Sequence, residues 1–319
     1  MMKPWIALLI VSLAIAAGAT TAQSYPSQPI RLIVPFGPGS GSDIVARRLG
    51  LYLQDRWKQP VVIDNRPGAH GMIGTQVLKN SAADGYTLGM STNSTHAAAQ
   101  HLFKRLPYDP LVDFEHVGLI GVGGAVALVP SDSPFKTVPQ LAAYAKTHPG
   151  KLFFGHADTI SQIPGELLRA GAKLPVEGVA YKTSAGVIVD LIGGQIQFAF
   201  FNYMTGATQA ASGRLVPIAI TEPNRSPRWP GVPAVSETYP GQEVTFFVGV
   251  SAPRGVPPAI VAKLHRALQE AQEDPQFKDP LESVGMTFVR QPLGEYRTFI
   301  AREAERWREH IEVAGLVPR

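Results

Sequence analysis

Short apolar runs that favour β-strands alternate along this chain with segments of helical periodicity, and this alternation restricts the possible folds more than any other feature of the sequence. Strands separated by helices usually pair in parallel, so the pattern predicts an α/β fold built on parallel sheets. Seven strands are expected, at residues 31–35, 61–64, 86–91, 152–155, 178–181, 197–201 and 215–220.

The loops that directly follow these strands are the candidate binding loops, because ligands of such sheets bind beyond the carboxyl ends of the strands. Five of these loops carry small polar or amide side chains, at residues 36–42, 92–96, 156–162, 182–184 and 202–205. A glycine-punctuated apolar stretch, residues 117–130, separates the first two loops from the other three and is long enough to connect two lobes.

The chain is therefore predicted to form two lobes around a central ligand cleft. The first lobe comprises residues 23–122 and 248–319, and the second comprises residues 123–247. A return crossing is expected near residues 244–253, and a long amphipathic helix over residues 294–314 is expected to pack back on the first lobe.

The first candidate loop contains three glycines, Gly37, Gly39 and Gly41, between an apolar strand and a helix. Without side chains, its backbone N–H groups can approach a ligand closely. The helix that follows begins with unpaired N–H donors and a partial positive charge. The loop is either an anion-binding site or a tight strand-to-helix connection without a ligand, and composition favours neither interpretation.

Composition excludes several classes of site. The chain has no cysteine, which excludes disulfides, thiolate metal sites and a bacterial lipid anchor. Lys and Arg are interspersed with acidic residues, as in residues 302–312, whereas nucleic-acid binding requires a basic cluster. The net charge of +4 is compatible with an anionic small molecule, and no nucleic-acid partner is predicted.

The N-terminus has the pattern of a secretory signal peptide. Lys3 supplies a positive start, residues 5–17 are apolar, and small residues precede a cleavage site after Ala22. A membrane-spanning helix needs about 20 consecutive apolar residues, more than this run contains. We therefore expect residues 1–22 to be removed and the mature protein to be soluble outside the cytoplasm.

Common catalytic motifs are absent from the sequence. The glycine-rich loop does not end in Gly-Lys-Ser/Thr, no Gly-x-Ser-x-Gly turn follows a strand, and the eight histidines form no His-Glu-x-x-His pair. The sequence therefore predicts neither an enzyme nor a bound metal or cofactor.

Several segments resemble the extracytoplasmic solute receptors of tripartite tricarboxylate transporters, the Bug family. They are YPSQPIRLIVPF (residues 25–36), PVVIDNRPGA (60–69), ADGYTL (83–88), LPYDP (106–110), AYK (180–182), LIGGQ (191–195) and SAP (251–253). The resemblance extends over essentially the whole mature chain. It implies a type II periplasmic binding protein fold whose two lobes close on a small carboxylate without catalysing a reaction.

The resemblance also implies which residues bind the ligand. One ligand carboxylate is held, partly through ordered water, by the first loop, which comprises Phe36, Gly37, Pro38, Gly39, Ser40, Gly41, Ser42 and Asp43. The same wall is completed by Ser94, Thr95 and His96. The opposite wall comes from the second lobe, with His156, Ala157, Asp158, Thr159, Ser161, Tyr181, Asn202 and Tyr203.

The second lobe departs from the family pattern at two places. The family commonly has a Gly- and Ser-rich turn followed by a histidine where this chain has residues 155–166, a segment one residue shorter. An acidic residue commonly found after the later strand is replaced in the sequence Phe200-Phe201-Asn202-Tyr203. The group that contacts the far end of the ligand is therefore expected to differ in this chain.

Several of these residues have two interpretations. Asp43 either caps the helix or contacts the ligand or its water. His156 either donates a hydrogen bond to a carboxylate or lies at the surface. Asn202 either binds the ligand or caps a helix. Phe36 and Tyr203 are expected to form aromatic walls of the cleft.

Together these observations predict a periplasmic solute receptor that binds a small mono- or dicarboxylate, aliphatic or aromatic, with a slight preference for aromatic acids. We expect it to act as a monomer and to deliver its ligand to the membrane components of a tripartite tricarboxylate transporter. Two alternatives remain at this point: a ligand-sensing receptor for a membrane sensor kinase, and a secreted enzyme on the same scaffold.

Overall fold

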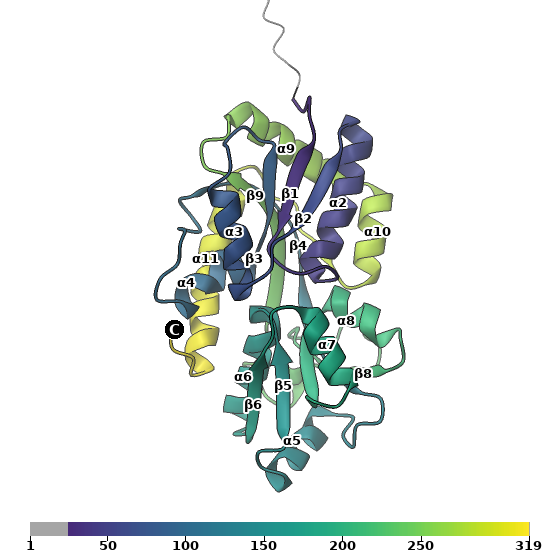
Figure 1. Cartoon of the computed structure of the whole chain (residues 1–319). Coiled ribbons are helices and arrows are strands. Elements are labelled where there is room, and N and C mark those ends of the chain that lie inside the picture. The colour runs from purple at the N-terminus through teal and green to yellow at the C-terminus, as the bar shows by residue number, and fades with distance from the viewer. Residues whose placement is uncertain (1–24, 319) are drawn as a thin grey trace, which may run out of the picture.

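The computed structural model describes residues 25–318, and the predicted signal peptide, residues 1–22, lies outside the described residues. One continuous sheet, in the order β2-β1-β3-β9-β4-β7-β5-β6, runs through two lobes, which lie one above the other in Figure 1. None of the helices in the described part of the chain is long and apolar enough to span a membrane.

The first lobe, the upper one in Figure 1, is built on three parallel strands, β1 (Ile30–Val34), β2 (Val61–Asn65) and β3 (Thr87–Thr92). Strand β9 (Thr245–Pro253) pairs antiparallel with β3. The helical segments of this lobe are α2 (Gly41–Trp57), η2 (Ala69–Gly71), α3 (Met72–Lys79), the π-helical turn η3 (Asn93–Ala98), α4 (Ala99–Leu102), α9 (Pro258–Ala271), α10 (Pro275–Ser283) and α11 (Glu295–Val313).

The second lobe is built on β5 (Leu152–His156), which pairs in parallel with β6 (Val176–Ala180) and β7 (Phe198–Asn202). Strand β8 (Leu215–Ile220) lies antiparallel to the long strand β4 (Phe114–Pro130). The helical segments are α5 (Val138–Thr147), α6 (Thr159–Gly171), α7 (Ser184–Ile192), α8 (Tyr203–Ala210) and η4 (Val235–Glu237).

Strand β4 connects the two lobes. Its residues up to Gly124 pair with β9, and those from Ala125 onward pair with β7 and β8. At this point the buried Thr221 hydroxyl accepts the backbone N–H of Ala125 and donates to the carbonyl of Val244, which precedes β9. The lobe boundaries predicted after residues 122 and 247 lie beside this crossing point and stay a prediction.

Each lobe has its own apolar core. In the first lobe, Leu32, Val250 and Trp307 belong to one cluster of buried side chains, and Trp307 comes from α11. The predicted return of the last helix to the first lobe is therefore correct. In the second lobe, Phe154 and Phe198 belong to a separate cluster on one face of the sheet. Burial of such large aromatic side chains stabilises both lobes. The first cluster also contains Ile163 and Leu167 of α6, so apolar packing continues from one lobe to the other.

The prediction of parallel sheets is correct for β1–β3 and β5–β7 and wrong for the centre of the sheet. Strands β4, β8, β9 and the short β10 (Thr287–Phe288) make antiparallel pairs. Strand β4 was expected only as a connection, because its glycines disfavour a strand in isolation. A Cβ atom at one of them, Gly121, would lie 2.5 Å from the carbonyl of Thr287, so the close approach of β10 requires glycine there.

Candidate functional site

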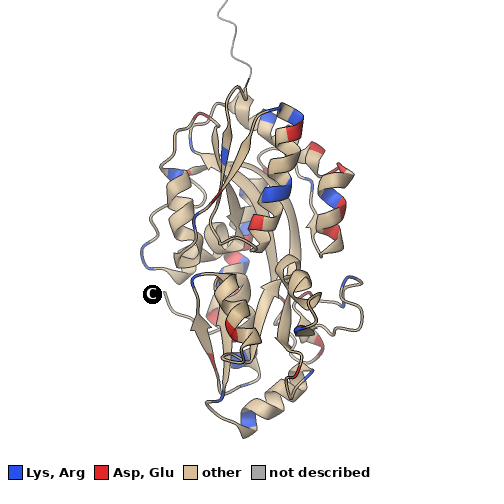
Figure 2. Ribbon diagram, turned by 45° about the vertical axis from the view of Figure 1, so that its right-hand side comes forward, with Lys and Arg blue, Asp and Glu red and all other residues tan. Residues whose placement is uncertain are grey.

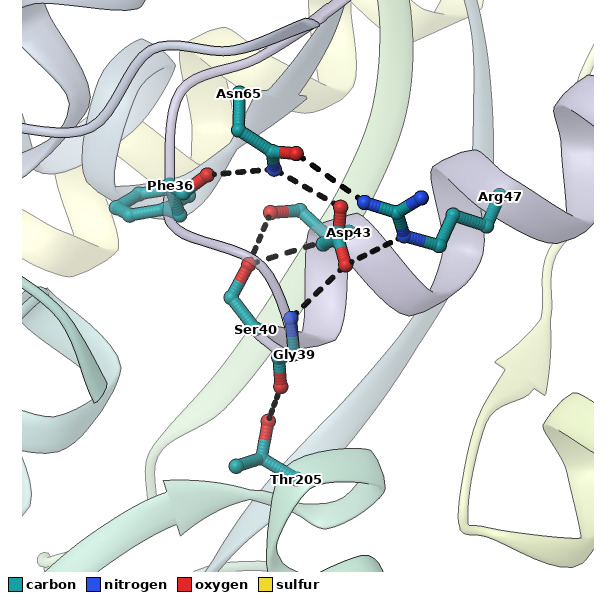
Figure 3. Close-up of polar contacts among 8 residues, drawn as sticks. Phe36, Gly39, Ser40, Asp43, Arg47, Asn65 and Thr205 are labelled. Atoms are coloured by element: carbon teal, nitrogen blue, oxygen red, sulfur yellow. Dashed lines mark hydrogen bonds and ion pairs between the residues drawn. The ribbon is translucent and has the colours of Figure 1, made fainter. Parts of the chain in front are cut away.

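The glycine-rich loop between β1 and α2 is held in shape by hydrogen bonds from its own helix (Figure 3). Ser40 is the N-cap residue of α2, and its hydroxyl accepts the backbone N–H of Asp43 at 3.4 Å. The Asp43 carboxylate in turn accepts the backbone N–H of Gly39 at 2.9 Å. This arrangement fixes the turn so that the start of α2 faces the second lobe.

Of the two interpretations of Asp43, the helix cap is wrong, because the N-cap position belongs to Ser40. Asp43 lies at the third helical position, and its two oxygens are occupied by Gly39, by Arg47 Nε at 2.9 Å and by Asn65 Nδ2 at 2.9 Å. Asn65 also donates to the carbonyl of Phe36, which ties the loop to β2. The carboxylate is thus an internal brace of the loop (Figure 3).

Two backbone donors at the start of α2 remain open. Among the described residues, the N–H groups of Gly41 and Ser42 have no hydrogen-bond acceptor. They belong to the first turn of a helix of 17 residues, where the helix dipole adds a partial positive charge. Such a position binds carboxylates and phosphates without a basic side chain.

Helices α6 and α8 of the second lobe begin close to the start of α2. Asp158 caps α6, with its carboxylate accepting the backbone N–H of Ser161 at 2.9 Å. Asn202 caps α8, with its side-chain oxygen accepting the backbone N–H of Thr205 at 3.0 Å. Residues from the starts of α2, α6 and α8 therefore line one shared cavity between the lobes.

This cavity has a volume of about 30 Å³, room for only about two water molecules. Its lining contains both polar and apolar residues: Phe36, Ser40, Gly41, Ser42, Thr92, Asn93, Ser94, Asp158, Ile160, Asn202, Met204, Phe246, Phe247 and Val248. Because the space is so small, the lobes are closed on each other in this structure, and a dicarboxylate can enter only if they move apart.

Direct contacts between the lobes hold them closed. The hydroxyl oxygens of Ser94 and Thr159 lie 2.6 Å apart, and the Asn93 amide donates to Thr159 Oγ1 at 2.8 Å. The Thr205 hydroxyl donates to the carbonyl of Gly39 at 3.2 Å (Figure 3). A Cβ atom at Gly41 would lie 2.5 Å from Asn202 Oδ1, so only glycine allows this approach.

The structure brings together many of the residues predicted for the site. Seven of them line the cavity: Phe36, Ser40, Gly41, Ser42, Ser94, Asp158 and Asn202. Gly37 lies against Thr183, and Gly39 and Thr159 make the contacts between the lobes described above. Pro38 is exposed at the tip of the loop, while Ala157 is buried, and its N–H donates to the Ser161 hydroxyl.

Other predicted residues lie away from the cavity. His96 points into the core of the first lobe, where its ring packs 5.0 Å from Phe114 and burial lowers its pKa well below the ordinary value. The π-helical turn η3 rotates this side chain inward, and the neighbouring Thr95 hydroxyl accepts the backbone N–H of Thr92. Tyr181 donates to Asp190 on α7 at 2.7 Å.

Tyr203 and His156 also need correction. Tyr203 is completely buried and packs against Trp229, and a Cβ atom at Gly124 would lie 2.7 Å from its ring. It therefore supports the crossing of the lobes and forms no wall of the cavity. His156 is only 3% exposed, with its ring 6.1 Å from that of His70 in the other lobe, so the surface interpretation is wrong. It does not line the cavity.

Sequence reasoning missed the apolar wall of the cavity. Phe246, Phe247 and Val248 belong to β9, which was predicted only as a crossing segment. Ile160 and Met204 occupy the second positions of α6 and α8. The useful signal was the crossing itself, because a strand that passes between two lobes necessarily runs beside their cleft.

The cavity contains little charge. Asp158 is the one ionisable residue among the described residues that line it, and burial raises the pKa of its carboxyl group. Elsewhere, Lys and Arg alternate with Asp and Glu along the outer helices, such as α2 and α10 (Figure 2). A larger groove of about 940 Å³ lies between these two helices, but all of its lining residues belong to the first lobe.

Comparisons with known proteins agree with this geometry. Residues 45–316 match the sequence profile of the tripartite tricarboxylate transporter family receptor. Protein BugT of Bordetella pertussis is 34% identical over 314 residues, which cover 97% of this chain and 96% of BugT.

Two solved structures are similar over the whole fold. An R. palustris protein with adipate is 28% identical, with a TM-score of 0.89, and the match covers 92% of this chain and 100% of that protein. MatC from Rhodopseudomonas palustris with bound malate is 28% identical, with a TM-score of 0.84 and coverage of 90% and 100%.

Proposed function

This chain belongs to the tripartite tricarboxylate transporter receptor family and has the fold of periplasmic binding proteins, and on this basis we propose that it captures a small carboxylate between its lobes and delivers it to the membrane components of such a transporter. Because the family consists of solute receptors, the chain is a solute-binding protein and not an enzyme. The proposed site of action is the periplasm, to which residues 1–22 would direct export before they are removed.

The observation that carries this proposal is the pair of open N–H groups at Gly41 and Ser42. They face a cavity on which the starts of three helices converge, so an anion there interacts with several partial positive charges at once. No basic side chain lines the cavity in the described part of the chain, so the backbone supplies the anion-binding donors.

Ligand capture must involve movement of the lobes. The cavity volume of about 30 Å³ is far below the roughly 300–1,000 Å³ of typical small-molecule pockets. The lobes meet through polar contacts, Ser94 with Thr159 and Gly39 with Thr205. Apolar residues of α6 and α8 also pack in the core cluster of the first lobe, so separation of the lobes exposes some apolar surface as well. We propose that the ligand enters an open form and that the lobes then close around it.

The class of carboxylate is narrowed only in part. The similar proteins solved with adipate and malate support an aliphatic acid for this chain as well. Phe36, Phe246 and Phe247 form an aromatic surface that can contact either a ring or a hydrocarbon chain. Since Tyr203 does not reach the cavity, half of the basis for an aromatic preference is lost.

Isothermal titration calorimetry of the mature protein tests the proposal. We expect at least one small mono- or dicarboxylate to bind, and the corresponding uncharged amide not to bind. Small-angle X-ray scattering should show a smaller radius of gyration with ligand than without it. If none of a broad set of mono- and dicarboxylates binds to the folded protein, the proposal is wrong.

A further inference from the structure

We propose that Asp158 selects, among carboxylates, those whose other end carries a hydrogen-bond donor, above all a protonated amine. This inference rests on the proposed function, because it assumes that the open N–H groups of Gly41 and Ser42 hold the ligand carboxylate. It adds the chemistry of the opposite end, which comes from the loop between β5 and α6.

The position of Asp158 is fixed by its own helix. Its side chain lines the cavity and is 8% exposed. Oδ1 accepts both the backbone N–H of Ser161 at 2.9 Å and the Ser161 hydroxyl at 2.6 Å. Among the described residues, no hydrogen bond reaches Oδ2. One oxygen is therefore committed to capping α6, and the other can accept a donor from a ligand.

The surroundings of Asp158 provide no counter-charge. No Lys, Arg or His is among the described residues that line the cavity, and the ion pairs found in the described chain do not include Asp158. A buried carboxylate without a cationic partner is costly, and the raised pKa of Asp158 reflects this cost. A cationic or donor group on the ligand would offset it.

The same arrangement disfavours a ligand with a carboxylate at each end. Gly41, Ser42 and Asp158 line the same cavity, so a ligand carboxylate bound by the first two directs the other end of the ligand toward Asp158, where a second carboxylate would be repelled. An ammonium group in the same place forms a charge-assisted hydrogen bond with Oδ2, and a hydroxyl group forms a neutral one. The predicted ligand is thus an amino acid or, with weaker binding, a hydroxy acid.

Calorimetry with ligands matched in length tests this inference at constant pH. Succinate, 4-aminobutanoate and butanoate differ at one end only, and so do malonate, 3-aminopropanoate and propanoate. We expect the amino acid of each set to bind at least about ten-fold more tightly than its two partners, because a site built for a donor rejects analogues that lack it.

Substitutions at helix caps separate the effect of the Asp158 charge on binding from its effect on the stability of α6. Asp158→Asn keeps a good helix cap but removes the charge, so it should abolish the preference for amino acids and improve succinate binding. Thr137→Ala is the matched control, because it weakens the N-cap of α5 in the same lobe and does not touch the cavity. It should lower the melting temperature and retain the preference.

The outcomes distinguish the two proposals. If succinate binds the wild-type protein as tightly as 4-aminobutanoate, or if Asp158→Asn keeps the preference, the assignment of Asp158 is wrong while the receptor function stands. If no member of either set binds, and neither malate nor adipate binds, the receptor function itself fails. The wild-type comparison is decisive even if Asp158→Asn does not fold.

Discussion

The hydroxyl oxygens of Ser94 in the first lobe and Thr159 in the second lie 2.6 Å apart, and Ser94 Oγ also accepts the backbone N–H of Thr159 at 3.1 Å. Thr159 is the first residue of α6, so a side chain of the first lobe accepts a hydrogen bond from a backbone N–H at the start of a second-lobe helix. The closed arrangement thus satisfies a polar group that would face water when the lobes separate.

Removing this contact should favour the open form. We expect Ser94→Ala and Thr159→Val each to weaken ligand binding by about five- to ten-fold, the equivalent of one hydrogen bond of about 1 kcal/mol. Both substitutions remove the contact between the two hydroxyl groups, and each also removes one further bond: Ser94→Ala that to the Thr159 N–H, and Thr159→Val that to Asn93. The double variant should therefore be worse than either single one, but by less than the sum of their effects. Calorimetry on the four proteins measures this coupling, and fully additive effects would show that the contact does not hold the lobes together.

Gly41 controls how closely the lobes approach. A Cβ atom there would lie 2.5 Å from Asn202 Oδ1, and that amide cannot move without losing its bond to Thr205. We expect Gly41→Ala to weaken binding by at least about ten-fold and to increase the radius of gyration of the liganded protein. Shortening the opposing side chain with Asn202→Ser should recover part of the affinity.

Gly213→Ala provides the comparison for this experiment. Gly213 has a positive φ of 71° in an exposed turn of the second lobe, with no atoms near its added Cβ. The substitution should cost about 1 kcal/mol of stability through backbone strain and leave binding unchanged. If the lobes of the Gly41→Ala protein closed normally, the close approach of Gly41 to Asn202 would be contradicted.

Local sequence patterns predicted most strands, because runs of β-branched residues favour a strand wherever they pack. These patterns failed at β4, because Gly121 and Gly124 are typical of a connecting segment. Only the pairing with β9 and β10 identifies this segment as a strand. That pairing joins segments far apart in the chain, so no local pattern could contain it. The two-lobed division was still predictable from the order of the binding loops.

The orientation of side chains at helix starts was the least predictable part of the site. Asn202, Tyr203 and Met204 follow one another, yet the first and third line the cavity while Tyr203 packs against Trp229. The side chains of successive helical residues point about 100° apart, so an error of one residue in the predicted helix start changes which side chains are assigned to the cavity. His96 was misplaced for the same reason, because it lies in a π-helical turn.

The role of Asp43 can be tested by whether its substitution weakens or strengthens carboxylate binding. If its carboxylate braces the loop through Gly39 N–H, Asp43→Ala should weaken carboxylate binding by about ten-fold or more and lower the melting temperature. If it instead faced the ligand carboxylate, the same substitution would strengthen binding by removing a repulsion. Arg47→Ala is the control, because it removes one partner of Asp43 and leaves the Gly39 contact in place. Calorimetry at pH 7.5 distinguishes the two directions.

Stability should fall in mild acid because of two histidines in the core of the first lobe. Burial lowers the pKa of His116 to about 4 and that of His96 well below its ordinary value of 6.5. Between pH 6.5 and 4 the unfolded chain binds more protons at these sites than the folded one, so the free energy of unfolding decreases as the pH falls.

The size of this effect follows from the shift of His116. Each pKa unit corresponds to about 1.4 kcal/mol, so this residue alone should account for a loss on the order of 2–3 kcal/mol by pH 4. Urea denaturation at pH 7.5, 6 and 4.5 measures the dependence. His116→Gln lowers the stability at neutral pH by disturbing the packing, but it should make the curve flatter between pH 6.5 and 4. An unchanged slope would mean that the folded and unfolded chains protonate His116 at the same pH, which would contradict the effect expected from its burial beside His96 and Tyr296.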